Sequence, residues 1–397
     1  MPQKISKHYF MNYSILIPYF ILNALGLIMV YSSTSYRKVI SGENSAKMVI
    51  TQTFFLLISL IMMLLIYKVR TQFLRNTALI KMVFMIGLFL LIITLIFGNF
   101  INGAKGWLRL GGHFSIQPAE YFKVLIPWLL ANEFSKQRKE IGYGDLRGFR
   151  QPLCLIFLSI GLVVAMSDLG NAVILFLITI VLLAVSGISY RWTLIFVPLF
   201  VIGGILLTTL VLASNGKGIP SYVYARFQAF ANPFAKEILQ DQGHQLANSY
   251  YAIHNGGWFG RGLGNSIQKK GYLPEAHTDF IFSVVIEELG ILVALIILGL
   301  FIYLTTRILL VGIRAYKPFN SILALGIGGM MFVQVFVNLG GVLGLIPSTG
   351  VTFPFLSQGG NSVLVLSIGV ALVLNVSADE SRTNLEYYLL RKEEKVV

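Results

Sequence analysis

The chain has 397 residues, of which 56% are hydrophobic and only 12% are charged, and its mean hydropathy is +0.75. This composition excludes an ordinary water-soluble globular protein and indicates a polytopic membrane protein. The formal net charge of +14 is accounted for by basic loops at the membrane surface and by attraction to anionic lipid. It therefore does not indicate a nucleic-acid partner.

Apolar runs long enough to cross a bilayer define the predicted architecture. About 20 helical residues span the hydrocarbon core, and each run is predicted to be a helix because lipid offers the backbone no hydrogen-bond partners. The sequence thus predicts an all-α polytopic membrane protein, one domain over 1–397, with about ten transmembrane helices and a large external loop at about 214–279. The predicted spans, in chain order, lie near 12–33, 48–67, 78–98, 119–134, 152–167, 170–187, 192–213, 280–306, 321–345 and 360–378.

The distribution of Lys and Arg predicts the orientation of these spans, because basic residues gather in cytoplasmic loops. Most of the Lys and Arg residues fall in cytoplasmic segments if both termini, including the tail at about 380–397, are cytoplasmic. A cleaved signal peptide is the alternative for residues 1–33, but this apolar stretch is longer than a usual signal core, which favours a retained helix. The single cysteine, Cys154, allows neither an internal disulfide nor a cysteine metal site.

The first polar group lies in the segment GWLRLGGHFSIQPAEYFK. Ser115 is a candidate helix cap, and Pro118 can occupy the first turn of the helix that follows. Glu120 and Lys123 are three residues apart and share one helix face, and such a pair inside a membrane helix requires that the partners meet or face a wet cavity. Two interpretations stay open: a structural ion pair with Arg109 reaching to the surface, and contact with a substrate.

Two further features place polar groups at membrane depth. Asp168 lies at the external hinge between two spans, where Gly170 permits the turn, and both helix capping and a functional carboxylate stay open. The segment 338–362 is rich in Gly and Pro and carries no charge. Irregular backbone at this depth needs support from protein or from a water-filled cavity. The segment is therefore predicted to be a re-entrant loop that lines a cavity.

The densest polar group lies at the end of the external loop, in GGWFGRGLGNSIQKKGYLPEAHTD. Glu275, His277 and Asp279 crowd together there, and capping of the next helix by Asp279 accounts for only one of them. No second histidine lies at a ligand spacing, so His277 is not predicted to bind a metal, and the glycines lack the context of a nucleotide-binding loop. The other polar candidates in this loop are Arg226, Gln245, Lys269 and Lys270.

These motifs, taken in order, resemble the SEDS family, the polytopic proteins of bacterial shape, elongation, division and sporulation. The resemblance covers nearly the whole chain and rests on GWLRLG, QPAEYFK, SDLG, the Arg226–Gln245 stretch, the LPEAHTDFIF region with EELG, and GLIPSTGVTFPFLSQGGNS. GNSIQKKGYLPEAHTDF is more similar to the cell-division branch than to the elongation branch. Ser167 stands where the family usually has proline, and SQGGN at 357–361 departs from its usual SYGGS, which bears on fine substrate contacts rather than on the reaction.

The resemblance implies a SEDS-type fold and peptidoglycan glycosyltransferase activity, in which lipid II, a polyprenyl-diphosphate-linked disaccharide peptide, is polymerised at the outer face of the cytoplasmic membrane. Asp279 occupies the position of the family's essential carboxylate, and we predict that it deprotonates the attacking sugar hydroxyl. Cations would meet the charge on the leaving pyrophosphate. No cofactor is required, although a divalent cation such as Mg²⁺ could bridge pyrophosphate and carboxylate. The predicted substrate-binding residues are Arg109 and Lys123, the first choices for the pyrophosphate, and Gln117, Glu120, Asp168, Arg226, Gln245, Lys269, Lys270, Glu275, His277 and Ser357.

The resemblance also implies partners and a place in the cell. The expected partners are a class B penicillin-binding transpeptidase, other division proteins and membrane lipid, and the expected place is the division septum. Two alternatives stay open: a transporter that flips lipid II along a polar path, and a division scaffold without chemistry. Transport predicts that Asp279 is dispensable and that polar residues continue through the bilayer, whereas the inner halves of most predicted spans are apolar.

Overall fold

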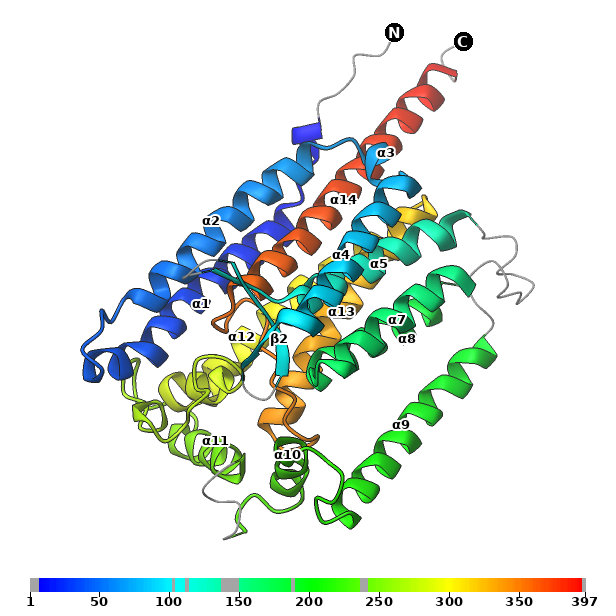
Figure 1. Cartoon of the computed structure of the whole chain (residues 1–397). Coiled ribbons are helices and arrows are strands. Elements are labelled where there is room, and N and C mark those ends of the chain that lie inside the picture. Colours follow the sequence, from blue (N-terminus) through cyan, green and yellow to red (C-terminus); the bar gives the residue numbers. More distant parts are fainter. Residues whose placement is uncertain are drawn as a thin grey trace.

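A computed structural model of the chain describes residues 7–101, 104–110, 114–136, 150–186, 190–235 and 242–394. Most of its long helices lie side by side in one bundle (Figure 1). Among the described residues, ten helices of at least 16 residues match the ten predicted spans, which confirms the predicted fold class. They are α1 (Tyr13–Ile40), α2 (Lys47–Lys68), α4 (Thr77–Phe97), α5 (Pro118–Lys136), α7 (Arg150–Ala165), α8 (Leu169–Val185), α9 (Tyr190–Ala213), α12 (Ile281–Arg314), α13 (Pro318–Val342) and α14 (Gly360–Glu394).

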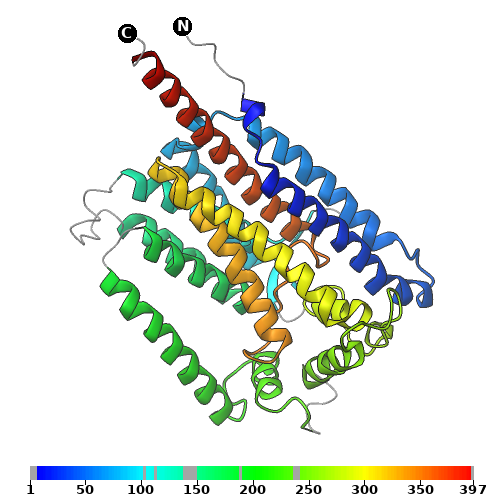
Figure 2. The same cartoon turned by 180° about the vertical axis from the view of Figure 1, so that it is seen from behind.

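The length and composition of its helices indicate that the chain is a multi-pass membrane protein. Six helices, α1, α2, α4, α12, α13 and α14, are long and apolar enough to cross a membrane, and α7, α8 and part of α9 are shorter apolar helices. The start of α1 and the end of α14 lie at one end of the bundle, hereafter the terminal end (Figures 1 and 2). The segment between α9 and α12 lies at the opposite end, hereafter the loop end.

The core of the bundle is formed by α13 and α14. In their most apolar 18-residue windows, 78% of α13 and 89% of α14 is buried, against 17% of α2. Glycines let α13 approach its neighbours closely: a Cβ added at Gly328 would lie 2.7 Å from Leu309 on α12, and one at Gly329 would lie 2.8 Å from Val181 on α8. Close backbone approach through small residues is a usual source of helix association in membranes. It fixes α8, α12 and α13 relative to one another.

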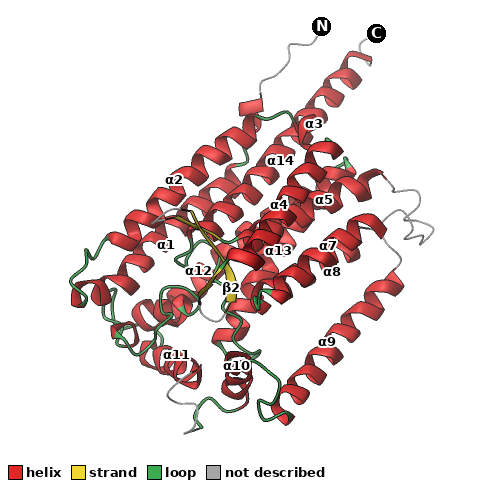
Figure 3. Cartoon of the chain, viewed as in Figure 1, coloured by secondary structure: helices red, strands yellow, loops and turns green. Residues whose placement is uncertain are grey.

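A small sheet, whose strands are yellow in Figure 3, was not predicted from the sequence. Strands β1 (Asn99–Ile101), β2 (Ala104–Leu110) and β3 (Phe114–Ile116) pair antiparallel in that order, with Arg109 opposite Ser115. The expectation that Ser115 caps the next helix was wrong, because Ser115 belongs to β3 and its carbonyl accepts a hydrogen bond from Asn361 Nδ2 at 2.9 Å. Pro118 begins α5, as predicted. The hairpin thereby leads the chain directly into the charged turn of α5.

Short helices between α9 and α12 cover the loop end, and this part of the chain connects to a break in α12. They are α10 (Ser221–Ala231), α11 (Gln242–Gly256) and the single turn η3 (Gln268–Lys270). Gly290 interrupts α12 with φ +81° and ψ 166°, a conformation that glycine adopts without a Cβ clash. The segment between α11 and α12 supplies partners to the interrupted backbone groups: Arg261 N donates to Glu287 O at 2.9 Å, and Ile291 N donates to Gly257 O at 2.9 Å. This pairing anchors the segment that carries Asp279.

The segment after α13 is irregular, as its composition predicted. Helix α13 continues to Val342, four residues beyond Asn338, and residues 343–359 then run without a helix to the start of α14 at Gly360. Part of this segment lines a cavity at the loop end. At the terminal end two short turns, η1 (Lys7–Phe10) and α3 (Thr71–Leu74), complete the described elements.

Candidate active site

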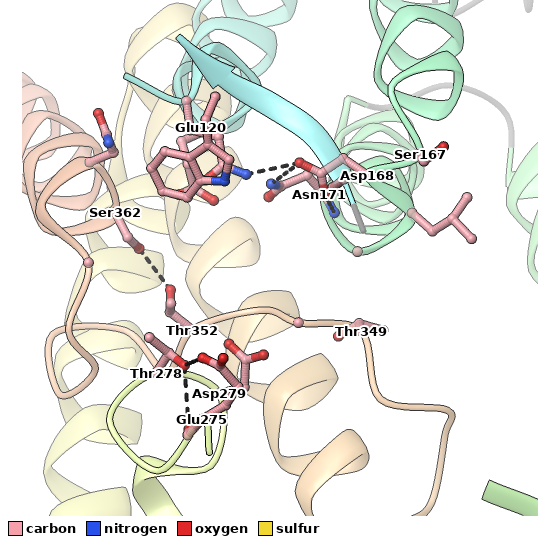
Figure 4. Close-up of a pocket in the computed structure, with 18 of the residues that line it drawn as sticks. Glu120, Ser167, Asp168, Asn171, Glu275, Thr278, Asp279, Thr349, Thr352 and Ser362 are labelled. Carbon is pink, nitrogen blue, oxygen red and sulfur yellow. Dashed lines mark hydrogen bonds between the residues drawn. The ribbon is translucent and has the colours of Figure 1, made fainter. Parts of the chain in front are cut away.

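A cavity of about 400 Å³ lies at the loop end of the bundle. This volume is within the range of pockets that hold small-molecule ligands. Its walls come from β2, the starts of α5, α8 and α14, helices α10 and α11, the loop before α12 and the segment 343–359. Figure 4 shows two groups of polar side chains facing it, with Glu120, Asp168 and Asn171 in one group and Glu275, Thr278 and Asp279 in the other.

Asp279 is held by hydrogen bonds to the backbone on both sides of it. Asn338 Nδ2 donates to Asp279 O at 2.8 Å and also to Val351 O at 2.7 Å, which ties the loop before α12 to the segment 343–359. Ser357 Oγ donates to Thr278 O at 2.6 Å and accepts from Phe353 N at 2.8 Å. Since these bonds hold the main chain, the carboxylate of Asp279 stays available to the cavity.

The pKa of Asp279 is raised from its ordinary value to about 7. Burial is the main cause, and the neighbouring carboxylate of Glu275 raises the pKa further because two like charges are costly at close range. The Arg226 guanidinium and the Thr278 hydroxyl act in the opposite direction. The Thr278 hydroxyl also donates to Glu275 Oε2 at 2.7 Å. A carboxylate with a pKa near the working pH is suited to accept and release a proton.

Arg226 supplies positive charge opposite this carboxylate. It lies on α10 with its guanidinium 5.9 Å from the centre of the Tyr222 ring, and its Nε has no hydrogen-bond partner in the described structure. Gly350 separates it from Asp279: a Cβ added there would lie 3.5 Å from Arg226 Nη2 and 3.6 Å from Asp279 Oδ2. Among the described residues that line the cavity, Arg226 is the one cation.

The opposite wall carries a buried ion pair. Lys123 Nζ donates to Glu120 Oε1 at 2.6 Å, and the Lys123 side chain is almost completely buried. The pair is one of the two interpretations that the three-residue spacing left open, and Glu120 also faces the cavity, as the other interpretation requires. Glu120 lines the cavity, and its Oε2 atom lacks a hydrogen-bond partner among the described residues. An acceptor without a partner in a polar cavity is suited to a ligand hydroxyl or amide.

Asp168 forms a fixed polar group beside Glu120. Its side chain accepts from the Asn171 backbone N at 3.2 Å, which caps α8, and from Gln117 Nε2 and Asn171 Nδ2, each at 2.9 Å. Ser167, rather than Gly170, makes the turn before α8 with φ +62°. Gly170 serves close packing instead, because a Cβ there would lie 2.2 Å from Thr349 O. The sequence had assigned the turn to Gly170, and that assignment was wrong.

The structure brings seven of the predicted site residues to one cavity. They come from five separate parts of the fold, the starts of α5 and α8, helices α10 and α11, and the loop before α12, and are Gln117, Glu120, Asp168, Arg226, Gln245, Glu275 and Asp279.

The other predicted residues lie outside the cavity lining. Lys269 is buried in an ion pair with Glu288 at 2.6 Å, and Lys270 lies 5.6 Å from the centre of the Tyr36 ring. His277 contributes its carbonyl, which accepts from Gln358 N at 2.8 Å, while burial lowers the pKa of its imidazole. Arg109 is exposed on β2. The two first choices for pyrophosphate are thus displaced, Arg109 to the surface and Lys123 to a place behind Glu120.

Sequence reasoning missed several residues of the lining. Thr349, Gly350 and Thr352 lie in the segment predicted to line a cavity, so the segment was found although its residues were not singled out. Asn171 had a usable signal, since it follows Asp168 at the spacing of a helix cap. The remaining missed residues include Trp107, Tyr222, Gln358, Asn361 and Ser362.

The fold and the site define a multi-pass membrane protein with an acidic cavity at one end of the helix bundle. A family model described as "Cell cycle protein", named for FtsW, RodA and SpoVE, matches residues 13–382. The chain belongs to this family, the SEDS family that its motifs indicated.

Named relatives and solved structures agree with this assignment. The chain is 46% identical over 407 aligned positions to the probable peptidoglycan glycosyltransferase FtsW of Lactococcus lactis, with 95% of each chain covered. It is 36% identical to the probable peptidoglycan glycosyltransferase FtsW of Bacillus subtilis, over 95% of this chain and 92% of the relative. A chain of a peptidoglycan synthase complex superposes with a TM-score of 0.72 at 24% identity, over 93% of this chain and 98% of that one. RodA of Thermus thermophilus has a TM-score of 0.65 at 24% identity, over 93% and 97% of the two chains.

Proposed function

We propose that the chain is a peptidoglycan glycosyltransferase that polymerises lipid II into glycan strands for septal wall synthesis. The observation that carries the proposal is the cavity at the loop end, where Asp279, with a pKa of about 7, lies opposite the Arg226 guanidinium. The position at one end of a membrane bundle suits a substrate whose sugars are polar and whose polyprenyl tail stays in the bilayer. The names of the relatives from L. lactis and B. subtilis support the same activity.

The proposed reaction uses these two side chains in distinct roles. Asp279 accepts the proton of a sugar hydroxyl on one lipid-linked disaccharide as that oxygen attacks the anomeric carbon of another. The bond between the anomeric carbon and the pyrophosphate oxygen breaks, and its electron pair leaves with polyprenyl pyrophosphate. Arg226 meets this negative charge, since a guanidinium offers several donors to phosphate oxygens. Glu120 and the Asp168 group bind hydroxyl or amide groups of the substrate.

The negative charge of the cavity favours a divalent cation that accompanies the pyrophosphate. In the described lining, four carboxylates (Glu120, Asp168, Glu275 and Asp279) accompany one guanidinium, and Lys123 pairs with Glu120 from behind the wall, so negative charge is still in excess. Pyrophosphate would be repelled by this excess of negative charge, so a cation such as Mg²⁺, brought in with the pyrophosphate, would assist binding. Among the described residues no group of three His, Cys, Asp or Glu side chains is arranged to hold a metal ion, so the proposed ion travels with the substrate.

Orientation and partners complete the proposal. The distribution of Lys and Arg supports cytoplasmic termini, and the loop end, with its cavity, then faces the outside of the cytoplasmic membrane. A class B penicillin-binding transpeptidase is the proposed partner, because a structure similar to this chain belongs to a complex that coordinates polymerization with crosslinking. Division proteins are proposed as further partners.

The test of this function is reconstitution of the full chain with its transpeptidase partner in vesicles that carry lipid II. Glycosyl transfer predicts glycan strands together with released polyprenyl pyrophosphate. A flippase would move lipid II between leaflets without strands, and a scaffold would do neither. Strand formation without translocation supports the proposal, and translocation without strands contradicts it.

Replacing Gly350 by alanine tests the space between Arg226 and Asp279. Gly350 has φ +76°, so a side chain costs about 1–2 kcal/mol of backbone strain, and the added methyl would lie between the two functional groups. We expect the rate of lipid II polymerisation to fall by about 10-fold to 100-fold, because small misplacements of reacting groups have effects of this size.

Gly218 provides a matched control. It has φ +74° and no atom within 4 Å of an added Cβ, so Gly218→Ala imposes similar backbone strain away from the cavity. Melting temperatures of both variants separate strain from function. Equal rates in Gly350→Ala and Gly218→Ala would show that the space at Gly350 is not used.

A further inference from the structure

A second cavity, of about 210 Å³, lies at the terminal end of the bundle, opposite the proposed active site. It is formed where the last turns of α12 pass α14 and the residue before α1, and Figure 2 shows these three helices together at that end. The proposed glycosyl transfer uses none of its residues. Its polar lining includes Asn12, Arg307, Arg314, Ser377 and Glu380.

Two arginines give this cavity positive charge. Arg307 and Arg314 are seven residues apart on α12 and therefore lie on the same face of the helix, two turns apart. The Arg307 Nε atom is buried and has no hydrogen-bond partner in the described structure. A buried guanidinium donor without an acceptor is costly, which points to an anion as the missing ligand.

The carboxylate in the cavity wall is already engaged. Glu380 Oε2 accepts from Tyr316 N at 3.0 Å, and its Oε1 accepts from Lys317 N at 3.1 Å and from Asn320 Nδ2 at 2.7 Å. These bonds tie α14 to the turn between α12 and α13. Glu380 therefore serves the packing of three helices and leaves the arginine donors to another acceptor.

The depth of Arg307 matches that of a lipid phosphate. It follows the break in α12 at Gly290 by seventeen residues, which corresponds to about 25 Å of helix. This length is close to the thickness of the hydrocarbon core, about 30 Å. The predicted span 280–306 ends directly before Arg307, which places Arg307 near the boundary between hydrocarbon and headgroups and Arg314, the last residue of α12, farther toward the headgroup layer.

The amino-terminal end of α1 and exposed apolar side chains lie beside the cavity. Asn12, the residue before α1, donates from Nδ2 to Ser377 Oγ at 3.2 Å, and the first turn of α1 contains no acidic residue. The amino-terminal end of a helix carries partial positive charge and unpaired N–H groups. Nearby Tyr13 and Ile313 are 66% and 68% exposed, as lipid-facing side chains are.

We propose that this cavity binds the phosphate of an anionic membrane lipid in the leaflet at the terminal end. The two guanidinium groups bind the phosphate, the hydroxyl and amide side chains bind the remaining headgroup, and the acyl chains lie along the exposed apolar surface beside it. Basic pockets between transmembrane helices are a known means of holding such headgroups. The bound lipid would fasten α1, α12 and α14 together.

The test is native mass spectrometry of the full chain with phosphatidylglycerol or phosphatidylcholine, together with melting temperatures in the same lipids and in inorganic phosphate. We expect phosphatidylglycerol to be retained preferentially and to raise the melting temperature by a few degrees, since a ligand of the native state stabilises it. The double variant Arg307→Gln with Arg314→Gln should lose both effects. Arg314→Gln alone, at an exposed position, should weaken both and covers the case in which the double variant does not fold.

The control is Lys68→Gln with Arg70→Gln, which removes two exposed cations from the terminal end outside the cavity. It should retain phosphatidylglycerol as the parent does. Equal retention by the control and by the Arg314→Gln variant would overturn the proposal. A melting-temperature rise with inorganic phosphate that equals the rise with phosphatidylglycerol would also overturn it, in favour of a free anion as the ligand.

Discussion

Asp279→Asn is expected to lower the rate of lipid II polymerisation by about 10²-fold to 10⁴-fold, the contribution typical of a positioned general base. The carboxamide is similar in size but cannot take the proton of the attacking hydroxyl. The bonds that position this residue involve its main chain and that of Thr278, so they remain in the variant. Initial rates with the transpeptidase partner present, at matched amounts of complex, provide the measurement.

The melting temperature of the Asp279→Asn variant distinguishes a lost base from a misfolded protein. An acid whose pKa is raised in the folded state binds its proton more tightly there than in the unfolded chain, so its contribution to stability declines as pH rises from the unfolded pKa through about 7. The ionised carboxylate therefore costs stability above that pH, and the neutral asparagine should melt no earlier than the parent at pH 8. An inactive variant with a lowered melting temperature would not support the role of Asp279 as base, and an active variant would refute it.

Arg226→Gln is the second change with a large expected effect. It removes the cation that lines the cavity, and loss of one such stabilising group typically costs about 10²-fold to 10³-fold in rate. It also removes the charge that lowers the pKa of Asp279. The pKa of Asp279 should then rise, so a larger share of the base is protonated at neutral pH. We expect the loss in kcat/KM at pH 7 to be only partly recovered at higher pH.

The conservative variant Arg226→Lys distinguishes charge from geometry. Lysine keeps the positive charge, so the pH dependence should stay near that of the parent, but it lacks the fixed fork that binds two phosphate oxygens. Its rate should fall between those of the parent and of Arg226→Gln. Parent-like rates in Arg226→Gln would show that this residue has no role in the reaction. Arg109 and Lys123 would then be the remaining candidates for binding the pyrophosphate.

The sequence predicted the helices and the loop of Asp279 because both depend on local signals. Apolar runs of about 20 residues require helices in lipid, and the three-residue spacing placed Glu120 and Lys123 on one helix face, where the structure pairs them. Whether a given Lys or Arg side chain points into the cavity depends instead on tertiary packing. Lys269 satisfies the buried Glu288, and Arg109 lies exposed on β2, a position set by the pairing of β2 with β1 and β3. No local sequence signal distinguished Arg226 from the other candidate cations.

The most direct test of Asp279 as the base is the pH dependence of lipid II polymerisation, measured from about pH 5 to about pH 9. Loss of activity on substitution can also reflect lost binding, whereas a pH profile reports the titrating group itself. The base must be ionised, so the rate of the parent should rise with pH through about 7. Glu275→Gln removes a charge that raises the pKa of Asp279 and should move this rise to lower pH. A rate that is level across the range, or a rise that Glu275→Gln leaves in place, would contradict the account.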